Sequence, residues 1–275
     1  MRCALSVQHF LNHKFYHMRK TLTIAFACIA ICFTCCKKDK STPEPEPEPQ
    51  VEAAWSSSAQ WGTWTNGGYT LFNNIWGGGA GSQSIWANSF SNWGIWGNHP
   101  NTGGVKAYPN STRTINRVLG SLNSLTSSIN ITSPSGGAWT SCFDVWDNNH
   151  QHEIMLWMNY TSNSNGSGNI KPISATWNSA GNPVPVFTNL SVGGATWNVF
   201  RGSNGANNVY SFLRTTKTNN TTVDIRAIAN WIRNQGWFGN ITVGDVQFGY
   251  EITSSYGTNG AGLQWTTNSY SVSFN

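Results

Sequence analysis

The chain is 275 residues long and carries a net charge of +5, with charged residues making up only 10% of it. From Ala53 onward, nine Lys and Arg stand against six Asp and Glu without a basic cluster, so the electrostatic footprint of a nucleic-acid-binding protein is absent. A 13% share of aromatic residues excludes disorder for the bulk of the chain, and the length allows one large all-β domain or two average ones.

Residues 1–36 are predicted to be a leader that is not part of the fold. Met18 is the expected start, because Met18-Arg19-Lys20 forms a charged segment ahead of an apolar run at 22–34 that is too short to span a membrane as a helix. The run ends at two cysteines and resembles a bacterial lipoprotein signal, in which a cysteine is lipidated. Cys36 is the expected lipidation site, Cys35 is the alternative, and an ordinary cleaved secretory peptide is the other reading.

Residues 37–53 are predicted to be a linker, because the stretch STPEPEPEPQ at 41–50 alternates proline with glutamate. Alternating proline enforces extended polyproline II, so ten residues span roughly 30 Å. Leader and linker together predict a protein that a lipid anchors outside the cytoplasm of a bacterium, with the outer membrane expected and the cell surface left open. Five of the six cysteines lie in the leader, so Cys142 has no disulfide partner and is expected in the core.

Residues 54–275 are predicted to form one all-β domain, because short strand-like runs alternate with Gly, Asn and Ser clusters. One helix interrupts them: Asp224 can cap it, apolar residues recur at i, i+3, i+4 and i+7 from Ile225, and Gly236 follows as a stop. The simplest arrangement packs this helix on the outer face of one sheet. The expected strands are 69–73, 85–90, 114–118, 138–147, 153–160, 184–190, 195–201, 208–214, 245–252 and 270–274.

Glu153 and Glu251 are the only glutamates after Glu52, and each lies in an apolar strand-like run. Because side chains alternate between the two faces of a strand, both glutamates lie on the polar side of their runs, opposite an apolar face. The pattern predicts a groove with acids on its floor and aromatic walls. The residues predicted to share this face are Glu153, Met155 and Trp157 in the first run, Gln247, Gly249 and Glu251 in the second, and Asp144 and Trp146 in a third.

Two carboxyl groups that face each other across an aromatic groove are the minimal equipment for cleaving a glycosidic bond. With retention of configuration, one carboxylate attacks the sugar, and the other, kept protonated by burial and repulsion, donates a proton. Asp144 could hydrogen-bond Glu153 and tune its ionisation. Tryptophans offer flat apolar platforms for sugar rings, so the expected ligand is a neutral, hydroxyl-rich polysaccharide. The alternative for each glutamate is a structural role, as a polar residue held by hydrogen bonds.

Six segments carry a resemblance to a known family. In chain order they are GGYTLFNNIWGGGAGSQ (67–83), VKAYPN (105–110), FDVW (143–146), EIMLWM (153–158), TWNVFRGSNGANNVYSFL (196–213) and VQFGYE (246–251). Together they are similar to glycoside hydrolase family 12, a family of secreted β-1,4-glucanases. The resemblance implies a β-jelly roll sandwich of two antiparallel sheets with a long concave cleft, retaining chemistry, and neither a cofactor nor a metal.

The resemblance also implies roles for single residues. Glu153 is the implied nucleophile, Glu251 the implied acid/base, and Asp144 the implied support of the nucleophile. Implied substrate contacts are Trp61, Asn74, Trp76, Met155 and Trp157, and the alternation along the strand adds Gln247 to the groove.

Several features depart from the family pattern or stay open. The loop between Asp144 and Glu153 looks shorter than is usual in the family, which predicts a more open cleft edge, and the disulfide found near the N-terminus of some members is absent. His150 and His152 could be read as metal ligands, but solvated loop residues are the favoured reading because no third ligand is in sight. A separate group either extends a binding platform or simply packs: Trp86, Trp93 and Trp96.

The sequence therefore predicts a lipid-anchored, monomeric, retaining endo-β-1,4-glucanase that acts on cellulose, mixed-linkage glucan or xyloglucan, without a nucleic-acid partner. One alternative is a non-catalytic surface glycan-binding protein on the same scaffold, and another is a xylanase on the related jelly roll. The choice between xyloglucan and an unbranched glucan stays open, because it depends on side pockets that loops form.

Overall fold

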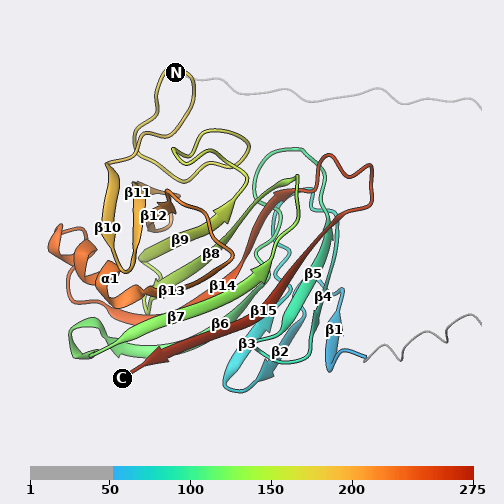
Figure 1. The fold of residues 1–275 in the computed structure, drawn as a ribbon, viewed down its shortest axis with the longest axis horizontal. Helices are drawn as coiled ribbons and strands as arrows, with labels where there is room; N and C mark the ends of the chain where they lie inside the picture. The colour runs from blue at the N-terminus through green and yellow to red at the C-terminus, as the bar shows by residue number, and fades with distance from the viewer. Residues whose placement is uncertain (1–51) are drawn as a thin grey trace, which may run out of the picture. The chain divides into compact units, whose positions relative to one another are not determined.

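The computed structural model describes residues 52–275, and the predicted leader, linker and lipidation site at Cys36 lie outside this part of the chain. Over the described range, fifteen strands form two sheets, joined by one α-helix and one short 3-10 helix, η1 (Leu119–Ser121) (Figure 1). None of the helices in this range is long and apolar enough to cross a membrane.

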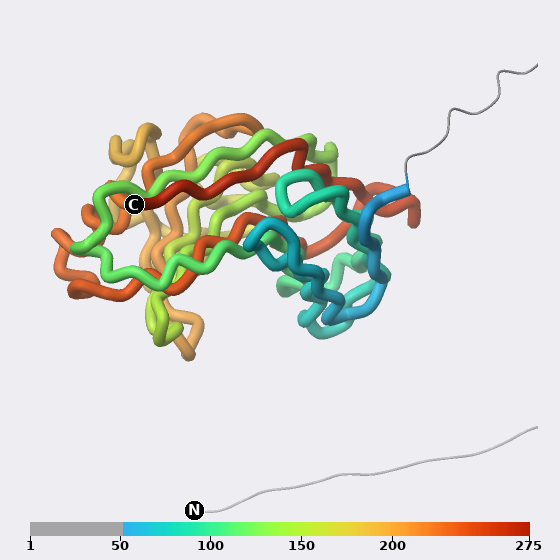
Figure 2. The backbone as a smooth tube through the Cα atoms, turned by 90° about the horizontal axis from the view of Figure 1, so that it is seen from below, coloured from blue at the N-terminus to red at the C-terminus, as the bar shows by residue number. Residues whose placement is uncertain are grey.

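The smaller sheet has six strands, and all of its neighbours pair antiparallel. Figure 2 shows its two long strands, β15 in dark red and β7 in green, running side by side. In spatial order the strands are β1 (Trp55–Ser57), β4 (Ser82–Ala87), β5 (Trp93–Asn98), β15 (Leu263–Phe274), β7 (Leu125–Thr132) and β13 (Asn220–Asp224).

The larger sheet has nine strands and is antiparallel except for one pair, in which β12 runs parallel to β9. The parallel pair arises because the chain leaves β9, crosses to the far edge, and returns through β10 and β11. In spatial order the strands are β10 (Phe187–Val192), β11 (Ala195–Ser203), β12 (Asn208–Arg214), β9 (His152–Tyr160), β8 (Ala138–Asp147), β14 (Thr242–Ser254), β6 (Asn110–Val118), β3 (Tyr69–Phe72) and β2 (Thr63–Asn66).

The main core lies between the two sheets, which makes the domain an all-β sandwich as the sequence predicts. It takes alternate residues from each strand, including Ile154, Leu156 and Met158 of β9 and Phe248 and Tyr250 of β14. The alternation expected from the sequence is therefore confirmed for both glutamate-bearing strands. We call the face of each sheet that points away from this core its outer face.

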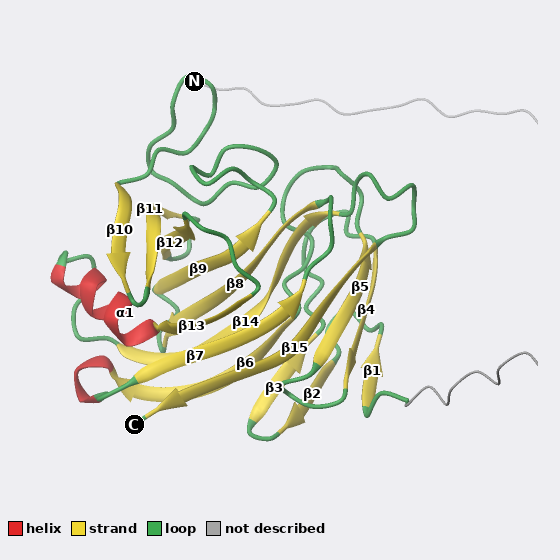
Figure 3. Ribbon diagram, in the orientation of Figure 1, coloured by secondary structure: helices red, strands yellow, loops and turns green. Residues whose placement is uncertain are grey.

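The amphipathic helix α1 (Ile225–Asn234) forms where the sequence predicts it, but it lies at one end of the sandwich and not on the outer face of one sheet, as was expected (Figure 3). It begins after Asp224, whose Oδ1 accepts a hydrogen bond from the backbone N–H of Ala227 at 2.9 Å. It contacts β7 of one sheet and β10 of the other, so it closes the end of the main core. Its buried residues, Ile225, Ile228, Ala229 and Ile232, join that core.

A second, smaller core covers part of the outer face of the nine-stranded sheet. The long connection 161–186 lies over this face, and its Ile170 and Ile173 pack against residues of β9, β11 and β12. Trp157, Phe200 and Leu213 are buried beneath it. The open part of the outer face is therefore limited to the region beside this connection, where the carboxyl groups lie.

Candidate active site

Glu153 lies near the start of β9 on the outer face of the nine-stranded sheet, opposite Trp146 of β8. A tight turn sets the start of this strand, because the Asp147 carboxylate accepts the backbone N–H groups of Gln151 at 2.8 Å and His152 at 2.7 Å. The side chain is 8% exposed, and Asn207 Nδ2 donates a hydrogen bond to its Oε2 at 3.0 Å. Burial raises the pKa of Glu153 to about 7, while the hydrogen bond from Asn207 opposes the rise.

Asp144 lies on the adjacent strand β8, in register with Met155 of β9 and Gln247 of β14. It is buried, and the Cys142 thiol donates a hydrogen bond to its Oδ1 at 3.4 Å. Burial, and then the negative charges of Glu153 and Glu251, raise the pKa of Asp144 well above its ordinary value. The three carboxyl groups therefore interact electrostatically across β9, β8 and β14.

Glu251 lies on β14, opposite Thr140 of β8, and its side chain is half-buried. A cavity of about 320 Å³ opens beside it, lined in part by Gly103, Gly104 and Gly168. Burial, and then the negative charge of Glu153, raise the pKa of Glu251 to about 8. Burial and a neighbouring negative charge thus favour the protonated form of Glu251, whereas the hydrogen bond from Asn207 favours the charged form of Glu153.

Two residues of the site are additions to the sequence prediction. Asp245 lies two positions before Gln247 on the same face of β14, and it accepts a hydrogen bond from Gln247 Nε2 at 3.1 Å. Asp245 alternates with Gln247 and Glu251 along the strand, and this pattern in the sequence is enough to place it on their face. Asn207 lies in the turn between β11 and β12, and no pattern in the sequence marks it as the hydrogen-bond partner of Glu153.

The predicted contacts at the β3 end are exposed and adjacent. Trp61 is 61% exposed and Trp76 is 50% exposed. Backbone hydrogen bonds from Asn73 to Gly62 and from Ile75 to Gln60 bring the two segments together. Ile75 also bridges to Ala107, which bridges to Ile252, so this end of the sheet continues directly to the strand of Glu251.

Asn74 lies between these tryptophan-bearing segments with a positive φ of 44°. Its Nδ2 donates a hydrogen bond to the Tyr108 carbonyl at 3.0 Å, and its own carbonyl accepts the Tyr108 N–H. This pair of bonds fixes the backbone beside Trp76 against the strand that leads to β6.

The predicted contacts on β9 and β14 differ in accessibility. Gln247 is half-buried on the outer face, whereas Met155 is buried and Trp157 is only 1% exposed. The prediction of a direct sugar contact by Trp157 does not hold in this structure, because the connection 161–186 covers its ring. Trp157 and Met155 instead pack in the smaller core, on the same face as Glu153.

The sequence left open whether Trp86, Trp93 and Trp96 bind substrate or pack, and the structure places them in two different environments. Trp93 is fully buried in the main core, whereas Trp86 and Trp96 lie on the outer face of the six-stranded sheet and so cannot extend a platform in this site. The two histidines also lie in different environments. His150 lies in the exposed turn with φ 53°, whereas Nδ1 of His152 is 3.0 Å from the Tyr210 hydroxyl oxygen. Cys142 is buried, as predicted.

The chain matches one family model and is similar to several known proteins. Residues 67–275 match the model of Glycosyl hydrolase family 12. A probable xyloglucan-specific endo-beta-1,4-glucanase A of Aspergillus fumigatus is 31% identical over 239 residues, which cover 81% of this chain and 93% of that protein. The Aspergillus terreus protein of the same description is 30% identical over 239 residues, covering 78% of this chain and 85% of that protein.

Solved structures add a similarity in fold. The xyloglucanase domain of NopAA, a type three effector from Sinorhizobium fredii in complex with cellobiose, is 46% identical, with a TM-score of 0.78, and the match covers 81% of this chain and 100% of that one. A cellulase derived from Cel12A of Rhodothermus marinus is 30% identical with a TM-score of 0.67, covering 80% of this chain and 99% of that one.

Proposed function

Because the chain belongs to glycosyl hydrolase family 12 and is a glycoside hydrolase, we propose that it is a retaining endo-β-1,4-glucanase in which Glu153 is the nucleophile and Glu251 the acid/base. The observation that carries the residue assignment is the hydrogen bond that Asn207 donates to Glu153, which favours the charged form of that carboxyl group. Glu251 lies on the same face, with only β8 between the two strands, and burial and the charge of Glu153 raise its pKa. A retaining glycosidase needs one ionised and one protonated carboxyl group.

In the first step, a Glu153 carboxylate oxygen attacks the anomeric carbon and forms a glycosyl ester. The bond from that carbon to the leaving oxygen breaks, and Glu251 gives its proton to the leaving oxygen. In the second step, water attacks the same carbon and gives a proton to Glu251. The Glu153 carboxylate then leaves, so the enzyme returns to its starting state and the product keeps its configuration.

The electrostatic contact between the two glutamates explains how Glu251 changes role. The negative charge of Glu153 raises the pKa of Glu251 in the free enzyme. Once Glu153 is an ester, that charge is gone, so the pKa of Glu251 falls and its carboxylate is ready to accept a proton from water. Asn207, which donates to Glu153, favours the charged form of the nucleophile before attack and after release.

We propose xyloglucan as a substrate beside unbranched β-1,4-glucans. The similar proteins from Aspergillus and Sinorhizobium are described as acting on xyloglucan. In this chain, three glycines line the cavity beside Glu251, and the exposed Trp61 and Trp76 lie along the same sheet. Glycines leave room for the side branches of a substituted chain, while the tryptophans offer flat faces for its backbone sugars.

Reducing-sugar release from tamarind xyloglucan, barley glucan, carboxymethylcellulose and xylan tests this proposal. We expect release from the first three and not from xylan. Release from xylan alone would favour the xylanase alternative. Binding of the protein to a glucan without any release of reducing sugar would favour the non-catalytic glycan-binding alternative.

Lipid attachment at Cys36, a location at the outer membrane and a monomeric state stay predictions from the sequence. Partition of the full chain into detergent, compared with a Cys36→Ala variant and a Cys35→Ala variant, tests the anchor. We expect only Cys36→Ala to move the protein to the aqueous phase. A shift with Cys35→Ala alone would assign the lipid to the other cysteine.

A further inference from the structure

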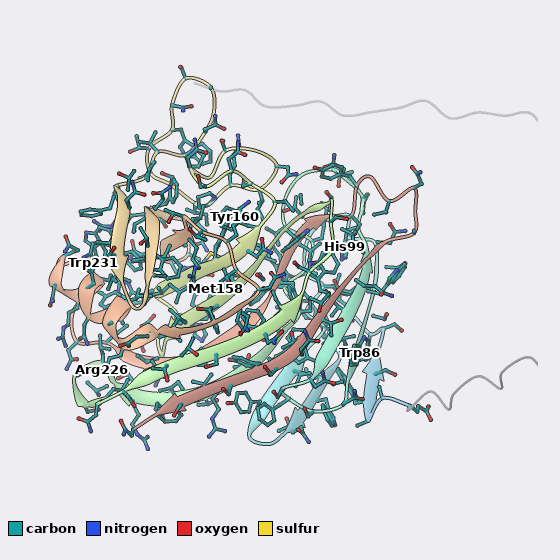
Figure 4. The ribbon with its side chains drawn as sticks, viewed as in Figure 1. Trp86, His99, Met158, Tyr160, Arg226 and Trp231 are labelled. Atoms are coloured by element: carbon teal, nitrogen blue, oxygen red, sulfur yellow. The ribbon has the colours of Figure 1, made fainter. Side chains whose placement is uncertain are left out.

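Two tryptophans lie on the outer face of the six-stranded sheet, on the opposite side of the main core from the carboxyl groups. Trp86 of β4 lies between the core residues Ile85 and Ala87, and Trp96 of β5 follows the core residue Ile95, so both rings point outward. Both side chains are partly exposed. Figure 4 shows Trp86 at the β1–β4–β5 end of the molecule, away from Met158 and Tyr160 of β9.

Glycines beneath the two rings allow them to lie close to the sheet. Gly94 is directly opposite Trp86, and a Cβ atom at Gly94 would come 2.7 Å from the Cζ2 atom of Trp86. A Cβ atom at Gly262 would likewise come 2.6 Å from the Nε1 atom of Trp96. Glycine in a strand marks a place where another group approaches the backbone closely. Each indole therefore lies over the backbone of its neighbour.

The position of one ring is fixed further by a hydrogen bond. Trp96 Nε1 donates to the Ala261 carbonyl at 2.9 Å, and Asn98 of the same strand donates to the Gly260 carbonyl at 3.1 Å. The polar edge of this indole is thus satisfied by the protein. Its exposed part is apolar, which suits the apolar C–H face of a sugar ring.

The face around the two tryptophans has no charged side chain. Among the six strands of this sheet the only charged residue is Asp224, which lies at the end of the edge strand β13 and caps the helix. Beside Trp86 there is a surface hollow of about 630 Å³. The residues that line it are Ser56, Ser57, Ser58, Ala59, Ser84, Ile85 and Trp86.

These features favour an uncharged ligand that is rich in hydroxyl groups. Serine hydroxyls both donate and accept hydrogen bonds, so they match sugar hydroxyls. An uncharged face gives no attraction to an acidic or basic partner. Trp86 and Trp96 are diagonal neighbours on adjacent strands, a relation that places Cα atoms about 7–8 Å apart, so one extended chain can reach both rings.

We propose that Trp86, Trp96 and the serine-lined hollow form a second, non-catalytic binding site for a β-1,4-glucan chain. The site holds the polysaccharide on the face of the six-stranded sheet while the nine-stranded sheet cleaves it. The binding site itself does not depend on the proposed catalytic residues, and only the choice of glucan as ligand rests on the proposed function.

Affinity electrophoresis in gels that contain xyloglucan or barley glucan tests the site, with Glu153→Gln as the common background so that the gel is not digested. Adding Trp86→Ala and Trp96→Ala together should weaken the retention of the protein in the glucan gel about fivefold, on the scale of one aromatic stacking contact. In the otherwise unchanged enzyme, the same pair should leave the kcat/KM for a short, soluble cello-oligosaccharide unchanged. Equal retention with and without the two tryptophans would overturn the proposal.

A second pair of variants keeps both tryptophans and so avoids any loss of packing. Ser84 lies opposite Trp96 and two residues from Trp86, so Ser84→Glu places a charge between the rings. Ser271→Glu makes the same change on the same face, opposite Ser128 of β7 and away from the tryptophans. We expect only Ser84→Glu to weaken retention. Equal losses from both variants would show a general effect of charge and contradict a defined site.

Discussion

The two outer faces of the sandwich are built from similar small polar residues and tryptophans, but they differ in charge. The outer face of the nine-stranded sheet carries Asp144, Glu153, Asp245 and Glu251 within three adjacent strands. The outer face of the six-stranded sheet carries only Asp224, at its edge. Tryptophan and hydroxyl groups suffice to hold a sugar chain, whereas cleavage needs carboxyl groups whose pKa values are separated by burial and mutual repulsion.

This contrast also has an energetic side. Buried carboxyl groups destabilise a fold when they are charged, because burial removes their hydration. The uncharged face carries no such cost. Variants that remove a carboxyl group should therefore lose activity and gain stability, whereas variants on the uncharged face should leave activity unchanged.

The largest effect is expected for the nucleophile. Glu153→Gln should lower kcat/KM on xyloglucan and carboxymethylcellulose by about 10⁴-fold or more, because the amide cannot form the glycosyl ester. Reducing-sugar release measures the loss. Glu52→Gln changes the exposed glutamate near the start of the described chain and serves as the control that keeps full activity. Equal sugar release by Glu153→Gln and the wild type would refute the assignment.

The acid/base should show a selective effect. Glu251→Ala should lower the hydrolysis of polysaccharides by about 10²–10⁴-fold but affect activated aryl glycosides less, because good leaving groups need little protonation. The wild type should lose activity as the pH rises through about 8, where Glu251 gives up its proton. This alkaline limb should disappear in the variant when aryl glycosides are assayed. Equal losses on both kinds of substrate would contradict the role.

The thiol of Cys142 should have a smaller, positioning effect. It donates a hydrogen bond to Asp144, so Cys142→Ala removes a bond that favours the charged form of that carboxyl. We expect kcat/KM to fall about threefold and the acidic limb of its pH profile to move. Cys142→Ser keeps a donor and should restore both. If Ser and Ala behave alike, the residue acts only by packing.

The smallest effect is expected in thermal stability. The pKa of Glu251 is raised from 4.5 to about 8 on folding, so the folded protein holds a proton that the unfolded chain releases between these values. Stability therefore falls as the pH rises through this window, and below pH 4.5 the difference vanishes. Glu251→Gln should raise Tm by about 2–4 °C at pH 8 and leave it unchanged at pH 4. A rise in Tm that is equal at both pH values would contradict the linkage.

Much of the site could be predicted because it lies on strands. In β9 and β14, apolar residues alternate with the functional ones, and the main core takes every second side chain as that alternation requires. The same alternation places Trp86 and Trp96 on the outer face and Trp93 in the core, although the sequence alone left open whether these tryptophans bind substrate or pack. Asp245 follows the same rule, two positions before Gln247 on the same face of β14.

The rest depended on contacts between distant segments. Nothing near Trp157 in sequence shows that the connection 161–186 lies over its ring, and nothing near Asn207 shows that its turn reaches Glu153. The strands β1, β2, β7 and β13 are short or rich in Ser, Thr and Asn, so their sequences do not differ from those of loops. Pairing with neighbouring strands stabilises them in the sheet.

Double displacement requires Glu153 to form a covalent bond to the sugar. The most direct test incubates the wild type with an activated 2-deoxy-2-fluoro cellobioside, which slows the hydrolysis of such an ester, and maps the label by peptide mass spectrometry. We expect one added fluoro-sugar on the peptide that contains Glu153, and none in Glu153→Gln. A label on Glu251 or Asp144, or no label on an enzyme that is active, would contradict it.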